Sequence, residues 1–198
     1  MARVLIWLGL AAAIATPIGL AALSPLLAWR DPIYVVAGFA GILGLTLMLI
    51  QPLLAAGLLP GLDRYRSRHV HRWTGIGLVL AIIVHVVGLW ITSPPDVIDA
   101  LTFTSPTPFA AWGVVAMWAA FGAATLALMR RRLRLRTWRI AHTTTVTIVV
   151  AGTIVHAVLI QGTMEPITKA ALCGLVGLTT LAVIARLRPW RRGRAGLN

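Results

Sequence analysis

Two histidine pairs with the same spacing lie inside apolar stretches of this chain. His71 precedes His85 by 14 residues, and His142 precedes His156 by 14 residues. On an α-helix, 14 residues advance about 21 Å along the axis and return to nearly the same face. Each pair therefore predicts one helix that presents two imidazoles on one face, at two separate depths.

The composition places these histidines in a membrane. Of the 198 residues, 59% are hydrophobic, and the mean hydropathy is +0.87, which lies outside the range of soluble globular domains. A membrane-spanning helix needs about 20 predominantly apolar residues. Six such stretches use most of the chain: residues 4–23, 33–56, 71–91, 109–129, 140–161 and 167–185. We predict an all-α integral membrane bundle of six helices that forms one domain over residues 1–198.

The first stretch has a second interpretation, because a single arginine followed by an apolar, Ala-rich run also resembles a secretory signal peptide. Its apolar run is long for a signal peptide, which favours a spanning helix. Removing it would leave the orientation of the other five helices and the histidine pattern unchanged.

The 18 basic residues indicate how the bundle is oriented. Only Arg30 and Lys169 lie at one end of the predicted helices, and the other sixteen lie at the opposite end. These are Arg3, Arg64, Arg66, Arg68, Arg72, Arg130, Arg131, Arg132, Arg134, Arg136, Arg139, Arg186, Arg188, Arg191, Arg192 and Arg194. Because basic residues concentrate on the cytoplasmic side, we predict a multi-pass protein of a bacterial-type inner (plasma) membrane with both termini in the cytoplasm.

The net charge of +13 does not indicate a nucleic-acid partner. Arginines at helix ends set the orientation of a membrane protein or attract anionic lipid, and here they do not form a soluble basic face. The predicted partner of this surface is therefore membrane lipid.

The helices predicted over 71–91 and 140–161 are the third and fifth, so they cross the membrane in the same direction. His71 and His142 then share an inner level next to the arginines, and His85 and His156 share an outer level. Imidazole is costly in hydrocarbon unless it meets a cavity, a partner or a ligand, and haem iron is commonly held by axial histidines. We predict two haems stacked across the membrane between these two helices, with the four histidines as iron ligands.

Charged side chains near the inner level fit the anionic propionates of haem. Arg72 and Arg139, together with Arg68, lie within about one turn of an inner histidine, and charge-assisted pairing would hold a propionate there. Arg72 and Arg139 are therefore candidate cofactor-binding residues. Four residues near the outer membrane surface are candidate propionate partners of the outer haem, but the sequence does not show which way their side chains point. They are Arg30, Gln161, Thr163 and Lys169.

The fifth histidine, His69, does not share the spacing of the others. It lies two residues before His71, among arginines. We expect a solvated residue at the membrane interface, with replacement of His71 as a ligand as the alternative.

The segments around these histidines resemble the ferric reductase-like transmembrane domain family. They are residues 68–75 (RHVHRWTG) leading to His85, and residues 138–142 (WRIAH) leading to His156. The superfamily includes NADPH oxidases, metalloreductases and the haem subunit of bacterial methionine sulfoxide reductase. The resemblance implies that His71, His85, His142 and His156 are axial ligands of two b-type haems and that the activity is transmembrane electron transfer.

By this resemblance, the chain would be the membrane haem subunit of an oxidoreductase that reduces an external acceptor such as ferric iron or oxygen. Fused members continue into a cytoplasmic flavin and NAD(P)H domain, whereas this sequence stops at Asn198. We therefore expect any flavin to lie on a separate flavoprotein reductase, with a quinol as the other possible donor.

Two alternatives remain open. In the first, the protein is a haem-binding anchor that passes quinol electrons to a periplasmic reductase, as in the methionine sulfoxide reductase system. In the second, it is a haem-free membrane carrier or structural protein whose histidines are hydrogen-bonded packing residues. No predicted span has Asp, Glu, Lys or Arg near its centre, which argues against a carrier built on carboxylate relays.

Overall fold

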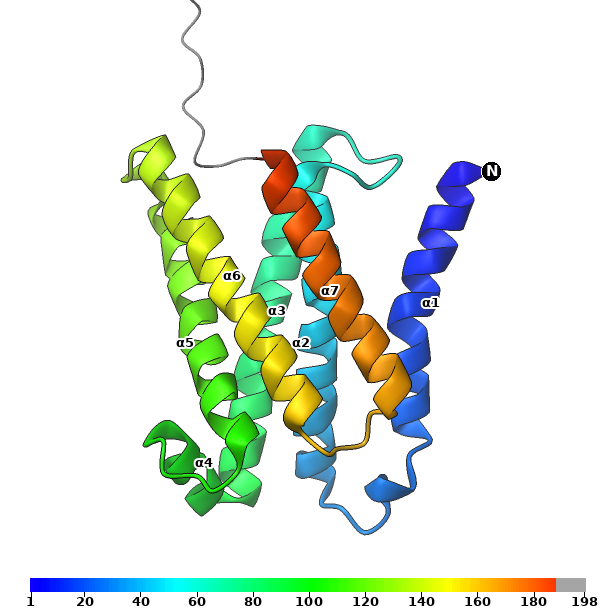
Figure 1. Cartoon of the computed structure of the whole chain (residues 1–198), viewed down its shortest axis with the longest axis vertical. Helices are drawn as coiled ribbons and strands as arrows, with labels where there is room; N and C mark the ends of the chain where they lie inside the picture. Colours follow the sequence, from blue (N-terminus) through cyan, green and yellow to red (C-terminus); the bar gives the residue numbers. More distant parts are fainter. Residues whose placement is uncertain (188–198) are drawn as a thin grey trace, which may run out of the picture.

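A computed structural model describes residues 1–187, and every regular element in that part of the chain is helical (Figure 1). The six long helices are α1 (Ala2–Ala22), α2 (Pro32–Ala56), α3 (Arg64–Thr92), α5 (Pro108–Leu128), α6 (Leu135–Leu159) and α7 (Pro166–Leu187). Each is long and apolar enough to cross a membrane, which confirms the six predicted spans. The predicted basic residues Arg188, Arg191, Arg192 and Arg194 lie outside the described residues.

Prolines and acidic side chains start most of these helices. A proline opens α2, α5 and α7, where its fixed φ suits the first turn and its missing N–H costs nothing. The carboxylates of Asp31, Asp63 and Glu165 accept backbone N–H groups in the first turns of α2, α3 and α7. The prolines and the carboxylate caps together account for the sharp helix starts near the membrane surfaces.

Three parts of the fold differ from the expectation, one of them being the start of α6 at Leu135 rather than at residue 140. The Asp63 cap starts α3 at Arg64 rather than at residue 71, because the polar turns before His71 continue the helix beyond its apolar part. The connection after α3 contains a short helix, α4 (Pro94–Leu101), which the apolar pattern did not predict. Shorter 3-10 turns, η1 (Pro25–Leu27) and η2 (Met129–Arg131), lie in two other connections.

The arginine-rich segments gather at one end of the bundle. Figure 1 shows the N-terminus, the α2–α3 connection and the α5–α6 connection together at the top, and η1, α4 and the α6–α7 connection at the bottom. We call the top the basic end and the bottom the opposite end. The separation of charge that the sequence predicts is therefore present in the fold.

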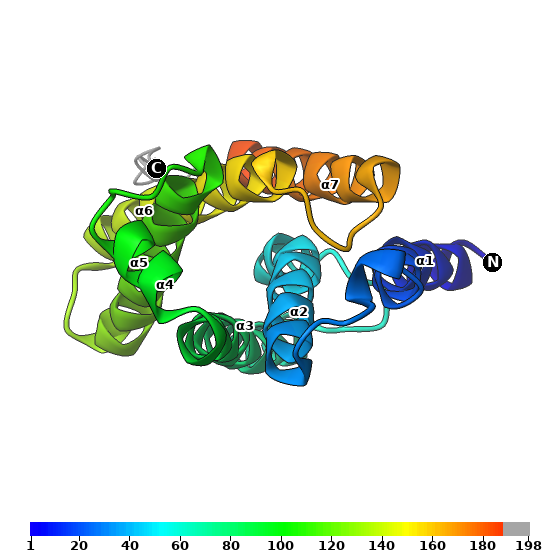
Figure 2. The same cartoon turned by 90° about the horizontal axis from the view of Figure 1, so that it is seen from below.

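The bundle is built from two helical hairpins. α2 packs along α3, and α5 packs along α6, whereas α3 and α6 do not pack extensively against each other (Figure 2). Helix α7 contacts α2 and α6 and so joins the hairpins on one side, and α1 lies at the edge against α2 and α7. The two helices that carry the paired histidines are thus held by their neighbours and not by direct packing on each other.

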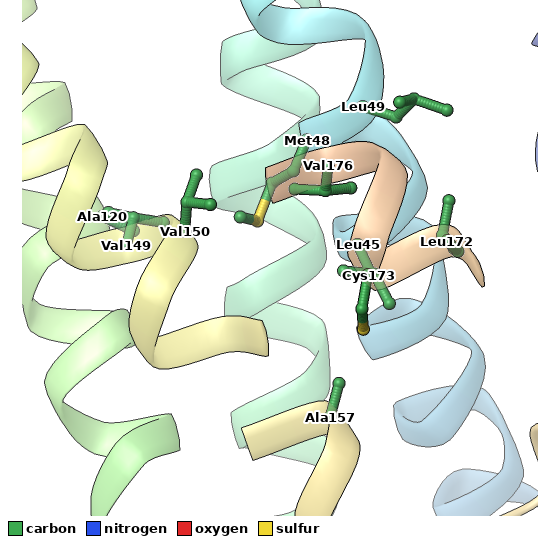
Figure 3. Close-up of a cluster of buried hydrophobic side chains, with 10 residues drawn as sticks. All are labelled: Leu45, Met48, Leu49, Ala120, Val149, Val150, Ala157, Leu172, Cys173 and Val176. Carbon is green, nitrogen blue, oxygen red and sulfur yellow. The ribbon is translucent and has the colours of Figure 1, made fainter. Parts of the chain in front are cut away.

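A cluster of buried side chains joins α2, α5, α6 and α7 (Figure 3). Its members are Leu45, Met48, Leu49, Ala120, Val149, Val150, Ala157, Leu172, Cys173 and Val176. Lipid tails are as apolar as these side chains, so close van der Waals contact rather than removal from water stabilises this packing. The cluster fixes α6 relative to α2, and therefore fixes α6 relative to the α2–α3 hairpin.

Candidate functional site

The four repeated histidines lie on the two co-directional helices. His71 and His85 are on α3, and His142 and His156 are on α6. Both helices begin at the basic end and finish at the opposite end (Figure 1). His71 and His142 therefore lie near the basic end, and His85 and His156 lie towards the opposite end, which is the two-level arrangement expected from the spacing.

At the outer level, the imidazoles of His85 and His156 come together from α3 and α6. Their ring centroids are 6.5 Å apart and their planes are at 83°. Imidazole nitrogens bind first-row metals at about 2 Å, so two imidazoles on opposite sides of one metal have centroids roughly 6 Å apart. The separation of this pair fits two axial ligands of a single iron.

At the inner level, His71 and His142 lie near the same end of α3 and α6. In residues 1–187 no three His, Cys, Asp or Glu side chains come together as a metal-binding group. A structural zinc site needs four protein ligands, whereas a porphyrin brings its own in-plane nitrogens and asks the protein only for axial ligands. Levels that each offer two imidazoles therefore fit haem.

Backbone carbonyls orient three of the four imidazoles through Nδ1. The Nδ1–O distances are 2.7 Å for His85 and Ala37, 2.9 Å for His156 and Phe109, and 3.2 Å for His71 and Gln51. A carbonyl oxygen can only accept, so Nδ1 carries the proton and the neutral ring keeps its Nε2 lone pair for a metal. Such bonds fix the orientation of a ligating histidine and raise its basicity.

Two glycines let the outer imidazoles reach these carbonyls. Gly41 follows Ala37 by one helical turn on α2, and Gly113 follows Phe109 by one turn on α5. A Cβ at Gly41 would lie 3.0 Å from Nδ1 of His85, and a Cβ at Gly113 would lie 2.7 Å from Nδ1 of His156. At Gly113 only a residue without a side chain allows this approach, and at Gly41 an added Cβ would push the ring by a few tenths of an ångström.

The same construction is therefore used twice. In each hairpin, one helix supplies a carbonyl and then a glycine one turn later, and the next helix supplies the histidine. Sequence reasoning missed Gly113, Ala37 and Phe109 as parts of the site. A signal was present, because the interval from Gly41 to Gly113 matches the interval from His85 to His156 to within one residue.

His142 is held differently. Its Nδ1 is buried and makes no hydrogen bond of full geometry, although the backbone carbonyl of Ala123 interacts with the ring. The imidazole instead stacks on Trp138, with ring centroids 5.2 Å apart and planes within 10°. The inner level thus combines one hydrogen-bonded imidazole with one stacked imidazole.

His69 is not part of the inner pair. It is exposed, and its Nε2 accepts a hydrogen bond from Trp73 Nε1 at 2.9 Å. That contact lies on the exposed face of α3 at the basic end, as expected for an interfacial residue. His71, whose ring bonds to α2, is the histidine that the fold brings to the inner level.

The two candidate arginines lie beside the inner pair. Arg72 follows His71 directly, Arg139 lies three residues before His142, and both side chains are exposed. The ion pair found among residues 1–187 joins Arg66 to Asp63, so neither candidate has a carboxylate partner in that part of the chain. The N–H donors of both guanidinium groups are therefore not used by a carboxylate in that part of the chain. That they bind haem propionates stays a prediction.

The outer-level candidates are not gathered around the outer pair. Gln161, Thr163 and Lys169 line a cavity of about 490 Å³ between the end of α1 and the α6–α7 connection, and Arg30 lies over the ring of Tyr34. Lys169 is buried, and its Nζ donates to the carbonyl of Ile160 at 2.7 Å. It therefore ties α7 to the end of α6, one turn beyond His156.

Comparison with known proteins gives one match. A family model described as ferric reductase like transmembrane component matches residues 40–153, which is more than half of the chain. The match contains His71, His85 and His142 and ends shortly before His156. No curated protein and no solved structure matches the chain. With six membrane-spanning helices and a match of this length, the chain belongs to the ferric reductase-like transmembrane component family.

Proposed function

We propose that this protein is a two-haem, b-type membrane cytochrome that carries single electrons across the membrane. The observation that carries the proposal is the His85–His156 pair, whose ring centroids lie 6.5 Å apart on two helices that do not pack on each other. The family supports electron transfer through the membrane, and the placement of His71 and His142 at the same end of α3 and α6 supports a second haem at the inner level.

The chain's own residues would hold and orient the cofactors. Haem, when bound, supplies a one-electron Fe(III)/Fe(II) couple. The histidines would bind the iron through Nε2, and the carbonyls of Ala37, Phe109 and Gln51 would hold the rings in the required tautomer. Because two imidazoles would hold each haem, an external acceptor would take its electron without being bound by the iron.

The charge distribution gives the proposed direction of electron flow. The basic end is the cytoplasmic side under the positive-inside rule, so the donor would act near His71 and His142 and the acceptor near His85 and His156. We propose a cytoplasmic flavoprotein reductase as the donor and an external acceptor such as ferric iron or oxygen.

A reduced-minus-oxidised optical spectrum, combined with a haem-to-protein ratio, tests this proposal. Protein purified from haem-replete cells is expected to show the spectrum of a six-coordinate b-type cytochrome and to contain two haems per chain. A featureless spectrum would contradict the proposal and leave a haem-free carrier or structural protein. A ratio of one would contradict the two-level arrangement.

The arginines beside the inner pair are expected to raise the midpoint potential there, because positive charge stabilises the reduced form. Replacing both Arg72 and Arg139 with glutamine should lower one of the two midpoint potentials by an amount on the order of tens of millivolts. Potentiometric titration followed optically measures this shift. Arg30→Gln at the opposite end is the control, and unchanged midpoints in the double variant would show that these charges do not act on the inner level.

A further inference from the structure

One of the four imidazoles, that of His142, has a weaker carbonyl contact than the others. His71, His85 and His156 each have Nδ1 within 3.2 Å of a backbone carbonyl on a neighbouring helix. Nδ1 of His142 is buried, and its contact with the carbonyl of Ala123 on α5 falls short of full hydrogen-bond geometry. A second contact is therefore needed to stop this ring from rotating about its side-chain torsion.

Trp138 makes the contact that can do this. It lies one turn before His142 on α6, and the two rings are nearly parallel, with an interplanar angle of 10° and centroids 5.2 Å apart. The indole is itself fixed, because Trp138 Nε1 donates to the carbonyl of Leu126 on α5 at 2.8 Å. An anchored aromatic face along the imidazole restricts rotation of the ring, since rotation would break the stacking or cause a clash.

The stack continues into the arginine-rich turn between α5 and α6. Cζ of Arg130, in η2, lies 4.8 Å from the centroid of the Trp138 ring, within the range of a cation–π interaction. The side chains of Arg130, Trp138 and His142 form one connected group, which we call the Arg130–Trp138–His142 stack. It links the surface of the basic end to one imidazole of the inner pair.

We propose that Trp138 is the positioning residue of the inner level: by stacking on His142 it holds a ring whose carbonyl contact is weaker than those of the other three imidazoles. The consequence for a bound haem rests on the function proposed above. At the inner level, His71 would be held by a carbonyl bond of full geometry and His142 mainly by the stack, whereas both outer imidazoles have such a bond. The orientation of the His142 ring would then depend on Trp138.

The test replaces Trp138 with leucine, which removes the aromatic face, and with phenylalanine, which keeps an aromatic face but loses the Nε1–H bond to Leu126. Trp73→Leu is the matched control, because Trp73 lies at the same end and contacts His69, which is outside both pairs. The readouts are the low-spin ferric EPR signals and the haem-to-protein ratio. The signal that disappears in His85→Ala identifies the outer level.

In Trp138→Leu, we expect the inner signal to shift or disappear while the outer signal stays unchanged. Trp138→Phe should restore a signal closer to that of the wild type, and Trp73→Leu should match the wild type. The unchanged outer signal serves as the check that the protein is folded.

Two results would overturn the inference. An inner signal in Trp138→Leu identical to that of Trp73→Leu would show that the stack does not position His142. Parallel loss of both signals would show a general role in the fold instead of a role confined to one level. Absence of haem from the wild-type protein is distinguishable from both, because it overturns the proposed function itself.

Discussion

Replacing His85 with alanine is expected to remove one haem and leave the other in place, so that the haem-to-protein ratio falls from two to one. The physical reason is that the two levels share no ligand: His85 comes together with His156, whereas His71 and His142 lie at the basic ends of α3 and α6. His156→Ala should remove the same haem, whereas His71→Ala and His142→Ala should each remove the other. Quantitative haem extraction and the EPR signals measure the outcome.

His69→Ala is the control for this series, because His69 is exposed and bonded to Trp73 on the surface of α3. It should keep two haems per chain. If His85→Ala instead removed the inner signal and spared the outer one, the assignment of histidines to levels would be wrong.

Gly113→Ala is expected to abolish or strongly weaken the outer haem signal, although the substitution adds a single methyl group. The new Cβ would lie 2.7 Å from Nδ1 and 2.9 Å from Cε1 of His156. Non-bonded atoms clash at these distances, so the imidazole would have to move. The ring would have to leave the carbonyl of Phe109, and bonds that orient a metal-ligating histidine typically affect metal affinity by about 10–100-fold. The haem-to-protein ratio and the outer EPR signal report this change.

Gly41→Ala should have a similar but smaller effect through His85, since the corresponding Cβ–Nδ1 distance is 3.0 Å. Gly38→Ala on the same helix is the matched control, because a Cβ there meets nothing within 4 Å. A helical glycine replaced by alanine normally gains up to about 1 kcal/mol of stability, so backbone propensity cannot explain a loss at Gly113. Retention of the wild-type outer signal in Gly113→Ala would show that contact with the ring is not needed.

Much of the architecture follows from local patterns along the chain. Six apolar stretches predict six spanning helices, because each segment must satisfy its own backbone hydrogen bonds in lipid. The arginines predict the basic end, and the 14-residue spacing of the histidines predicts two levels, because helical geometry converts sequence distance into depth and face. The helix starts were less predictable: Asp63 extends α3 beyond its apolar part, and α4 lies in a segment with no apolar span.

The sequence by itself determined the membrane setting, the number of spans, the charged end and the depth of each histidine, since all four depend on properties of single segments. Only the tertiary structure decided that Nδ1 of His85 meets the carbonyl of Ala37, that Gly113 admits the His156 ring, and that Trp138 stacks on His142. These contacts depend on how each helix is rotated against its neighbour, and packing between segments distant in the sequence sets that rotation.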